Sequence, residues 1–186
     1  MKGSLTILGS GTSQGVPVIA CDCYVCQSED PKDNRTRTSA MIHINGENHV
    51  IDSGPDFRSQ MLREKVKTLK SVIFTHEHKD HIAGLDDVRA FNFKEKREMN
   101  VYASNRVQEA LNREYQYIFA EVKYPGIPKI HLTTIDNEPF EIDEGIQITP
   151  IEVMHYKLPV FGFRIGDLTY ITDAKTISKK EREKIA

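Results

Sequence analysis

Long hydrophobic runs are absent from this sequence of 186 residues. Residues 1–10 contain only Leu5, Ile7 and Leu8 as strongly apolar side chains after the initial methionine, which is too few for the apolar core of a signal peptide. No later stretch approaches the roughly 20 apolar residues that a membrane-spanning helix needs. We therefore expect a soluble, cytoplasmic protein with no membrane partner.

An excess of charge of one sign is also missing. Charged residues make up 28% of the chain, and the formal net charge is −2. A protein that binds nucleic acid through its phosphates is expected to carry a basic patch or a basic arm. The basic stretches at residues 63–70, 94–97 and 179–182 all contain or adjoin acidic residues, which is typical of solvated faces. Nucleic acid is therefore not the partner that we expect.

The length favours one domain spanning residues 1–186. Asn45-Gly46 predicts a hairpin, because both residues accept a positive φ. Expected strands lie at residues 4–7, 40–44, 49–51, 71–74, 132–135, 146–155, 161–165 and 168–172, and expected helices follow Asp56, lie near residues 85–93 and follow Asn105. Strands and helices mixed in this order indicate a layered α/β sandwich.

Three details of these elements can be tested directly. Asp56 is placed to cap a helix that carries Phe57, Met61 and Leu62 on one face. The third helix places Val107, Leu111, Tyr115 and Ile118 on one face, with Asn105 as its cap. Pro150 interrupts the alternation of residues 146–155, which predicts an edge position or a bulge there.

Three histidines and two acidic residues follow the apolar strand at residues 71–74, in Thr75-His76-Glu77-His78-Lys79-Asp80-His81. Imidazole and carboxylate groups suit zinc, iron and manganese. His76 and His78 can point the same way from a strand-end loop, and Asp80 and His81 can face a second ion after the chain turns. Two ions that share a water lower its pKa and make it a nucleophile. A solvated turn rich in histidine is the alternative interpretation.

The pattern His-x-His-x-Asp-His after an apolar strand resembles the signature of the metallo-β-lactamase superfamily. Asp52 in Ile51-Asp52-Ser53-Gly54, His155 after the strand at residues 146–153, and Asp173 in Tyr170-Ile171-Thr172-Asp173 also match that family in order. The resemblance implies a four-layered αββα sandwich with two divalent metal ions, zinc or manganese.

The same resemblance implies a role for each of these residues. It assigns one metal to His76, His78 and His155 and the other to Asp80, His81 and Asp173, with Asp173 between them, Asp80 as the candidate catalytic residue and Asp52 supporting the metal loop from behind. Each outlying residue also has a structural alternative. Asp52-Ser53-Gly54 fits an ordinary turn, His155 fits a core or rim histidine, and Asp173 fits a helix cap.

The three cysteines are clustered, since Cys21, Cys23 and Cys26 lie within six residues. An odd, clustered set in a cytosolic chain indicates a metal site and not disulfides. Thiolates suit a closed structural zinc site, which needs a fourth ligand. His43, His49 and His131 are candidates without a compelling position, and loose buried thiols remain the alternative.

The segment Gly9-Ser10-Gly11-Thr12-Ser13-Gln14-Gly15-Val16-Pro17, followed by the cysteines, resembles the branch that contains the phosphoribosyl cyclic phosphodiesterase of phosphonate breakdown. In that branch the cysteines hold a structural zinc together with a C-terminal histidine. The glycine spacing is not that of a P-loop, because no Gly-Lys-Ser/Thr follows. We expect a tight turn at the rim of the active site, where backbone amides could contact a substrate phosphate.

The leading functional hypothesis is hydrolysis of a small, including a cyclic, phosphate ester through a hydroxide that bridges two metals. An RNA-processing endonuclease, a thioesterase or lactamase of the same fold, and a metal-binding scaffold without catalysis are the alternatives, because fold does not fix substrate. A homodimer is left open.

The end of the sequence suggests a fragment. Ser178 and Glu181 form a capping-box pattern, yet the chain stops at Ala186, about two helical turns later. The family pattern requires another histidine on the second metal, and no histidine follows His155. We therefore expect a C-terminally truncated sandwich with an incomplete second metal site, an open zinc position and an exposed sheet edge after residues 168–172.

Overall fold

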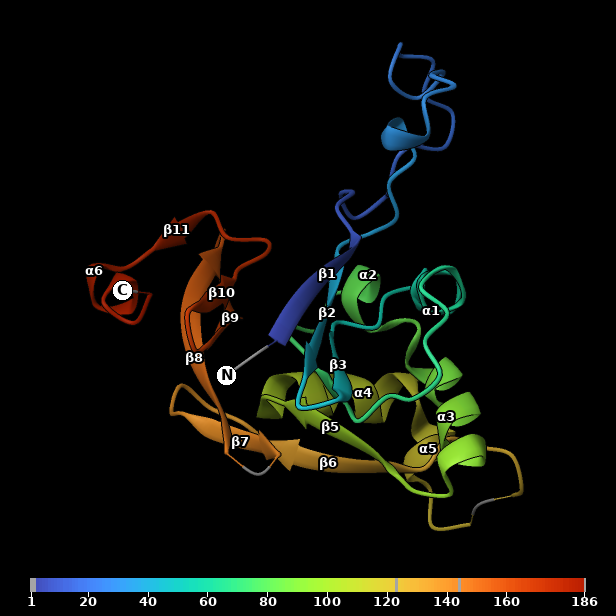
Figure 1. Ribbon diagram of the computed structural model, residues 1–186, viewed down its shortest axis with the longest axis vertical. Helices are drawn as coiled ribbons and strands as arrows, with labels where there is room; N and C mark the ends of the chain where they lie inside the picture. Colours follow the sequence, from blue (N-terminus) through green and yellow to red (C-terminus); the bar gives the residue numbers. More distant parts are fainter. Residues whose placement is uncertain (1–2, 123, 144, 186) are drawn as a thin grey trace.

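Two β-sheets face each other at the centre of the molecule (Figure 1), in a computed structural model that describes residues 3–122, 124–143 and 145–185. The first sheet has the order β1-β2-β3-β4-β5-β6, with β1 at Gly3–Gly9, β2 at Ser39–Ile44, β3 at Glu47–Ile51, β4 at Ser71–Ile73, β5 at Met99–Ala103 and β6 at Ile130–Thr134. Strands β1 to β3 are antiparallel, whereas β3 to β6 run parallel.

The second sheet is antiparallel and has the order β10-β9-β8-β11, with β7 also paired to β8. Its strands are β7 at Phe140–Asp143, β8 at Ile146–His155, β9 at Leu158–Ile165, β10 at Leu168–Tyr170 and β11 at Thr176–Ile177. The sequence predicted the long strand β8 with the bounds that the structure has.

Helices cover the outer face of the first sheet (Figure 1). They are α1 (Phe57–Arg63), α2 (Lys79–Ile82), the 3-10 helix η2 (Leu85–Val88), α3 (Arg89–Glu95), α4 (Asn105–Glu114) and α5 (Gln116–Phe119). Helix α6 (Lys179–Arg182) lies on the face of the second sheet that points away from the first sheet. The 3-10 helix η1 (Pro31–Asp33) belongs to the long connection between β1 and β2. The described chain contains no helix long and apolar enough to cross a membrane.

The buried side chains form three clusters that correspond to the spaces between these layers. Val72 and Phe74 pack between the first sheet and its helices, whereas Ile73 packs between the two sheets. Successive side chains of a strand point to opposite faces, so a strand buried on both faces is apolar at every position. A small cluster of Ile151, Val153 and Val160 lies on the outer face of the second sheet, beside Ile185. The α/β sandwich expected from the sequence is confirmed.

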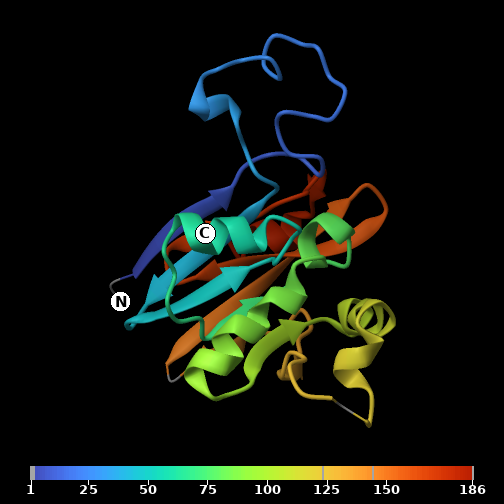
Figure 2. The same ribbon diagram turned by 90° about the vertical axis from the view of Figure 1, so that its right-hand side faces the viewer.

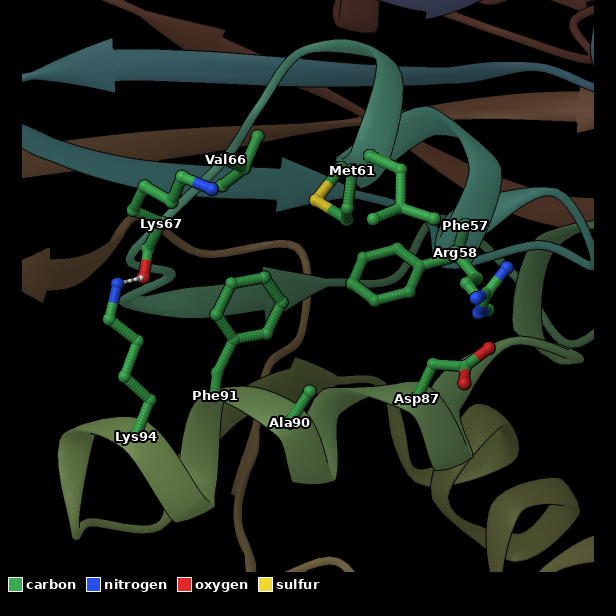
Figure 3. A pocket seen from close by; sticks show the side chains of 10 residues that line it. Phe57, Arg58, Met61, Val66, Lys67, Asp87, Ala90, Phe91 and Lys94 are labelled. Carbon is green, nitrogen blue, oxygen red and sulfur yellow. Dashed lines mark hydrogen bonds between the residues drawn. The ribbon is translucent and has the colours of Figure 1, made fainter.

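An apolar groove separates α1 from α3 (Figure 3). Phe57 and Phe91 meet edge to face in it, with ring centroids 6.4 Å apart. Leu62 also lines this groove and is 60% exposed, whereas Phe57 and Met61 are buried. The expectation that these three residues lie on one face of the helix is confirmed, since all three line the groove, although the groove leaves the Leu62 side chain largely exposed.

Two expected helix caps differ in the structure. The Asp56 side chain makes no cap hydrogen bond, because its carboxylate accepts hydrogen bonds from the backbone N–H and the guanidinium of Arg37. Ser104, and not Asn105, caps α4 by accepting from the Val107 N–H. The four residues expected on one face of that helical segment (Val107, Leu111, Tyr115 and Ile118) are all buried.

Pro150 lies where one side of β8 has no strand partner. Strand β7 pairs with β8 up to Ile148, and β11 pairs with it from Val153. Side chains of α6 and of the residues after it bond the backbone groups of β8 that have no strand partner here. Glu181 accepts a hydrogen bond from the Glu152 N–H, and Lys184 donates one to the Pro150 carbonyl. The residue without an N–H thus occupies a local edge, and the β8–β9 register continues through it without a bulge.

Candidate metal centre

The histidine-rich segment begins where β4 ends. The chain bends at Thr75, and the short helix α2 then brings His81 beside His76, with ring centroids 4.1 Å apart. The second sheet contributes the remaining side chains from two strand ends. His155 is the last residue of β8, and Asp173 follows β10.

The six side chains form two groups that share Asp173. One group contains His76, His78, His155 and Asp173, and the other contains Asp80, His81 and Asp173. Within each group, the potential ligand atoms all lie within 4.8 Å of one another. The Asp173 Oδ2 atom is 3.8 Å from Nε2 of His76, 3.8 Å from Nε2 of His155 and 3.5 Å from Nε2 of His81.

Hydrogen bonds fix the tautomer of His76 and leave its Nε2 atom without a partner. The Thr75 hydroxyl donates to Asp52 Oδ2, so its oxygen accepts from Nδ1–H of His76, 2.9 Å away. The Nε2 lone pair of His76 then points into the site, where this atom is buried with no hydrogen-bond partner. A buried polar atom without a partner is costly unless a ligand satisfies it. Such an atom among three imidazoles and carboxylates fits a divalent cation.

Asp52 lies beneath the metal-binding segment and is fully buried. Its carboxylate accepts from the N–H and hydroxyl of Thr75 and from Nδ1 of His81, at 2.8, 2.8 and 2.7 Å. The bond to Nδ1 directs Nε2 of His81 toward Asp80, 3.3 Å away. Asp52 therefore fixes the orientation of His81 directly and that of His76 through Thr75.

Gly54 allows the first motif to touch the histidine segment. A Cβ at this position would lie 2.0 Å from the backbone oxygen of Asp80, far inside van der Waals contact. The turn Asp52-Ser53-Gly54 is therefore the platform against which the segment carrying Asp80 is placed, and a side chain here would displace that segment.

Electrostatics distinguish the two buried histidines. Burial, with the nearby His81, lowers the pKa of His76 to about 4. Burial alone would also lower the pKa of His81, but the carboxylates of Asp52, Asp173 and Asp80 raise it to about 12. The hydrogen bond from His81 holds the pKa of the Asp173 carboxyl well below its usual range. The carboxylates around His81 thus favour positive charge at this position, which a divalent cation would supply.

The metal centre opens into a cleft made of two adjoining cavities. One, of about 660 Å³, is lined by Thr12, Ser13, His78, Asp80, His155, Asp173, Ala174 and Lys175. The other, of about 440 Å³, is lined by His78, Arg106, His155, Tyr156, Lys157 and Leu158. His78 and His155 belong to both, so the cavities meet over the candidate ligands. The glycine-rich turn does lie at the rim, through Thr12 and Ser13.

Sequence reasoning missed several residues of this cleft. Thr75, which connects Asp52 to His76, lies inside the motif but was not singled out. Tyr156 and Lys157 directly follow the candidate ligand His155, which was an available signal. Arg106 and Lys175 come from α4 and from the segment before β11, and nothing in their spacing connects them to the site.

The cysteine cluster lies in the long connection between β1 and β2, which projects from the body of the molecule (Figures 1 and 2). The sulfur atoms of Cys21, Cys23 and Cys26 lie within 4.8 Å of one another. Hydrogen bonds from the Cys26 backbone N–H and from neighbouring thiols lower the pKa of Cys23 to about 7. Among the described residues, none of the candidate histidines joins this group: His43 bonds Asn48, and His49 is buried against Ser71.

Comparisons with known proteins agree with this geometry. Residues 47–186 match the family described as Beta-lactamase superfamily domain. A solved diphosphatase from the PhnP family superposes with a TM-score of 0.89 and 38% identity, over 98% of this chain and 70% of that one. The human short-form tRNase Z shares the fold, with a TM-score of 0.68 and 18% identity, over 99% of this chain and 74% of that one.

Two curated relatives are longer than this chain. The octanoyltransferase of Porphyromonas gingivalis is 41% identical over 179 residues, which are 95% of this chain and 36% of that protein. The coenzyme PQQ synthesis protein B of Xanthomonas oryzae pv. oryzae is 27% identical over 176 residues, with 84% of this chain and 54% of that protein covered. The chain thus spans about a third and about half of these relatives. With its family match, its paired sheets and its clustered histidines, the chain belongs to the metallo-β-lactamase superfamily of hydrolases, in the branch of the PhnP-family diphosphatase.

Proposed function

We propose that this chain is a metal-dependent phosphodiesterase that acts on small phosphate esters, cyclic ones included. The observation that carries the proposal is the pair of ligand groups joined by Asp173 at the floor of a cleft. Two divalent ions held by such groups lower the pKa of a shared water and stabilise charge that develops on phosphoryl oxygens. Zinc and manganese both suit these ligands.

The residues of this chain would divide the work as follows. His76, His78 and His155 would hold one ion, Asp80 and His81 the other, and Asp173 would lie between them. Asp80 is also the candidate catalytic residue, because its half-buried carboxylate lines the larger cavity of the cleft. Asp52 and Thr75 would hold the imidazole rings in a fixed orientation, since both are buried. Thr75 is hydrogen-bonded to His76, and Asp52 is hydrogen-bonded to His81 and Thr75. This division of roles follows the order of residues that the sequence predicted.

The relatives differ in how strongly they support this chemistry. The PhnP-family structure is named a diphosphatase, and attack on a phosphorus atom is common to diphosphates and phosphodiesters. The octanoyltransferase name belongs to a protein of which this chain matches only 36%. An octanoyl thioester and a precursor tRNA therefore serve as comparison substrates for the thioesterase and endonuclease alternatives.

The test is hydrolysis of bis(p-nitrophenyl) phosphate by the metal-free protein reloaded with zinc or manganese. We expect release of p-nitrophenolate, and we expect the double variant His76→Ala/His78→Ala to lose at least about a hundredfold in kcat while keeping its far-ultraviolet circular dichroism. His43→Ala, at an exposed histidine outside the site, is the matched control. Turnover of the thioester or the tRNA but not the diester would overturn the proposal, as would full activity of the double variant.

We further propose that Cys21, Cys23 and Cys26 hold a structural zinc. Three converging sulfur atoms support this proposal because thiolates are the ligands of closed zinc sites. Among the described residues, no histidine, aspartate or glutamate side chain joins the three cysteines as a fourth candidate ligand.

A further inference from the structure

The groove between α1 and α3 is a second cavity that lies apart from the metal centre. It has a volume of about 260 Å³. Its apolar lining comes from α1, the loop after it and α3, through the side chains of Phe57, Met61, Leu62, Val66, Ala90 and Phe91. None of the residues that line the groove also lines the cleft over the candidate ligands. Mainly apolar walls with a few charged groups are typical of sites for small molecules.

The floor of this groove is fixed, while part of its apolar lining stays open to solvent. Phe57 and Phe91 are 1% and 8% exposed and contact each other edge to face, which holds both rings in place. By contrast, Leu62 is 60% exposed, Ala90 is exposed and Val66 is half-buried. A preformed floor beneath uncovered apolar side chains favours binding of a molecule that covers them.

The two ends of the groove differ in charge. Lys67 and Lys94 line one end, where the Lys94 ammonium group donates to the Lys67 carbonyl at 2.7 Å (Figure 3). Within the described part of the chain, neither lysine forms an ion pair with a carboxylate. Arg58 and Asp87 line the opposite end, where their opposite charges cancel. The groove therefore carries net positive charge at one end only.

The length of the groove limits what can fill it. Helices α1 and α3 have seven residues each, which corresponds to about 10 Å of helix. A stable protein partner needs a much larger contact, of about 1,000 Å² or more. An extended alkyl chain of about eight to ten carbons, with C–C bonds of about 1.5 Å, spans nearly the same distance as the two helices. A single aliphatic chain therefore fits the groove better than a helix of a partner protein does.

We propose that this groove binds a linear fatty acid, with its alkyl chain between α1 and α3 and its carboxylate at Lys67 and Lys94. The chain covers Leu62, Val66 and Ala90, and removal of this apolar surface from water favours binding. The two ammonium groups bind the carboxylate as point charges, and the end without net charge receives the terminal methyl group. This site is separate from the proposed catalytic function and does not depend on it.

Isothermal titration of the zinc-loaded protein with decanoate, below the concentration at which decanoate forms micelles, tests the site. We expect saturable binding of one decanoate per chain. Butanoate has the carboxylate without the long chain and should show no detectable binding. Decyltrimethylammonium has the same chain with the opposite charge and should bind about tenfold more weakly. His76→Ala/His78→Ala should bind decanoate as the wild type does, which distinguishes the groove from carboxylate binding at the metal ions.

A substitution that fills the groove gives a second test. Ala90→Phe should weaken decanoate binding at least about tenfold, because the added ring occupies the space of the alkyl chain and displaces its apolar contacts. Ala90 is exposed, so this variant should keep the wild-type Tm. Ala120→Phe, at an exposed alanine that does not line the groove, is the matched control and should bind decanoate normally. If Ala90→Phe lowers Tm, the lysine variants decide the question.

The lysine variants test the charged end. Lys67→Gln/Lys94→Gln should bind decanoate about fivefold more weakly and should lose the preference for decanoate over decyltrimethylammonium, because two exposed charge contacts are removed. Lys179→Gln/Lys180→Gln, at two exposed lysines of α6, is the control and should match wild type. Absence of decanoate binding, equal binding of decyltrimethylammonium to the wild-type chain, or full affinity in the Lys67→Gln/Lys94→Gln variant would overturn the proposal.

Discussion

His49 makes the stability of this protein depend on pH outside the metal centre. The side chain lies in the middle of β3, fully buried, with Nδ1 2.8 Å from the Ser71 hydroxyl and Nε2 without a hydrogen-bond partner. Burial lowers its pKa from 6.5 to about 4, and the positive charges of Lys70 and Arg97 act in the same direction. Asp143 raises this pKa and His43 lowers it, and both effects are smaller than that of burial.

The sign of the effect follows from the two pKa values. A histidine that must be neutral in the folded state contributes stability above its unfolded pKa of 6.5, and this contribution is lost as the pH falls toward about 4. Between about pH 7.5 and about pH 4.5 the loss amounts to roughly 2.5 kcal/mol, at about 1.4 kcal/mol per pKa unit. Such a loss is a large part of the stability of an ordinary domain.

Urea denaturation of the metal-free protein at these two pH values measures the loss. In His49→Asn, which keeps a polar group near Ser71 but cannot titrate, the drop in unfolding free energy on acidification should be smaller than in wild type by roughly 2.5 kcal/mol. The exposed His43→Asn is the control and should match wild type. If His49→Asn and wild type lose the same free energy between the two pH values, His49 is not held neutral by burial and the reasoning is wrong.

Two further predictions concern Gly54 and the cysteine cluster. Gly54→Ala should cost about 2 kcal/mol of stability and lower zinc affinity in a competition titration with a chelator, because its Cβ would lie 2.0 Å from the Asp80 backbone oxygen; unchanged affinity would show that the platform is not needed. Cys23→Ala should lose one zinc per chain by elemental analysis and lower Tm by about 5 °C, with the chemistry largely kept; the opposite pattern, intact Tm and lost turnover, would contradict a structural zinc.

The sequence predicted the clustering of the candidate ligands as far as the order of residues along the chain allowed. His76, His78, Asp80 and His81 lie within six residues after a strand, so few conformations of the chain could separate them. His155 and Asp173 had plausible structural roles when taken singly, and only their order within a family pattern placed them here. The cations at the rim were not predictable, because their meeting depends on how α4, the β8–β9 turn and the segment before β11 are arranged in space.

In the fold as well, features that depend on neighbouring residues were predicted, whereas features that depend on residues distant in the chain were not. The hairpin predicted from Asn45-Gly46 is confirmed, since both residues have the positive φ that their types allow, 52° and 84°. The cap at Asp56 failed because Arg37, 19 positions earlier in the chain, offers its carboxylate a stronger partner. Pro150 was correctly assigned to an edge, yet that edge exists only between β7 and β11, which no pattern within β8 could reveal.

The candidate metal centre joins the two sheets, since four of its side chains follow β4 and two come from the second sheet, at the end of β8 and after β10. The Phe161 N–H also donates a hydrogen bond across to the Thr75 carbonyl. Any cation bound there would tie both halves together and would stabilise the native state by mass action. Amide hydrogens of β4 and of β8 would then exchange with solvent more slowly by the same factor as the cation concentration rises, because opening either strand would require release of the same ion.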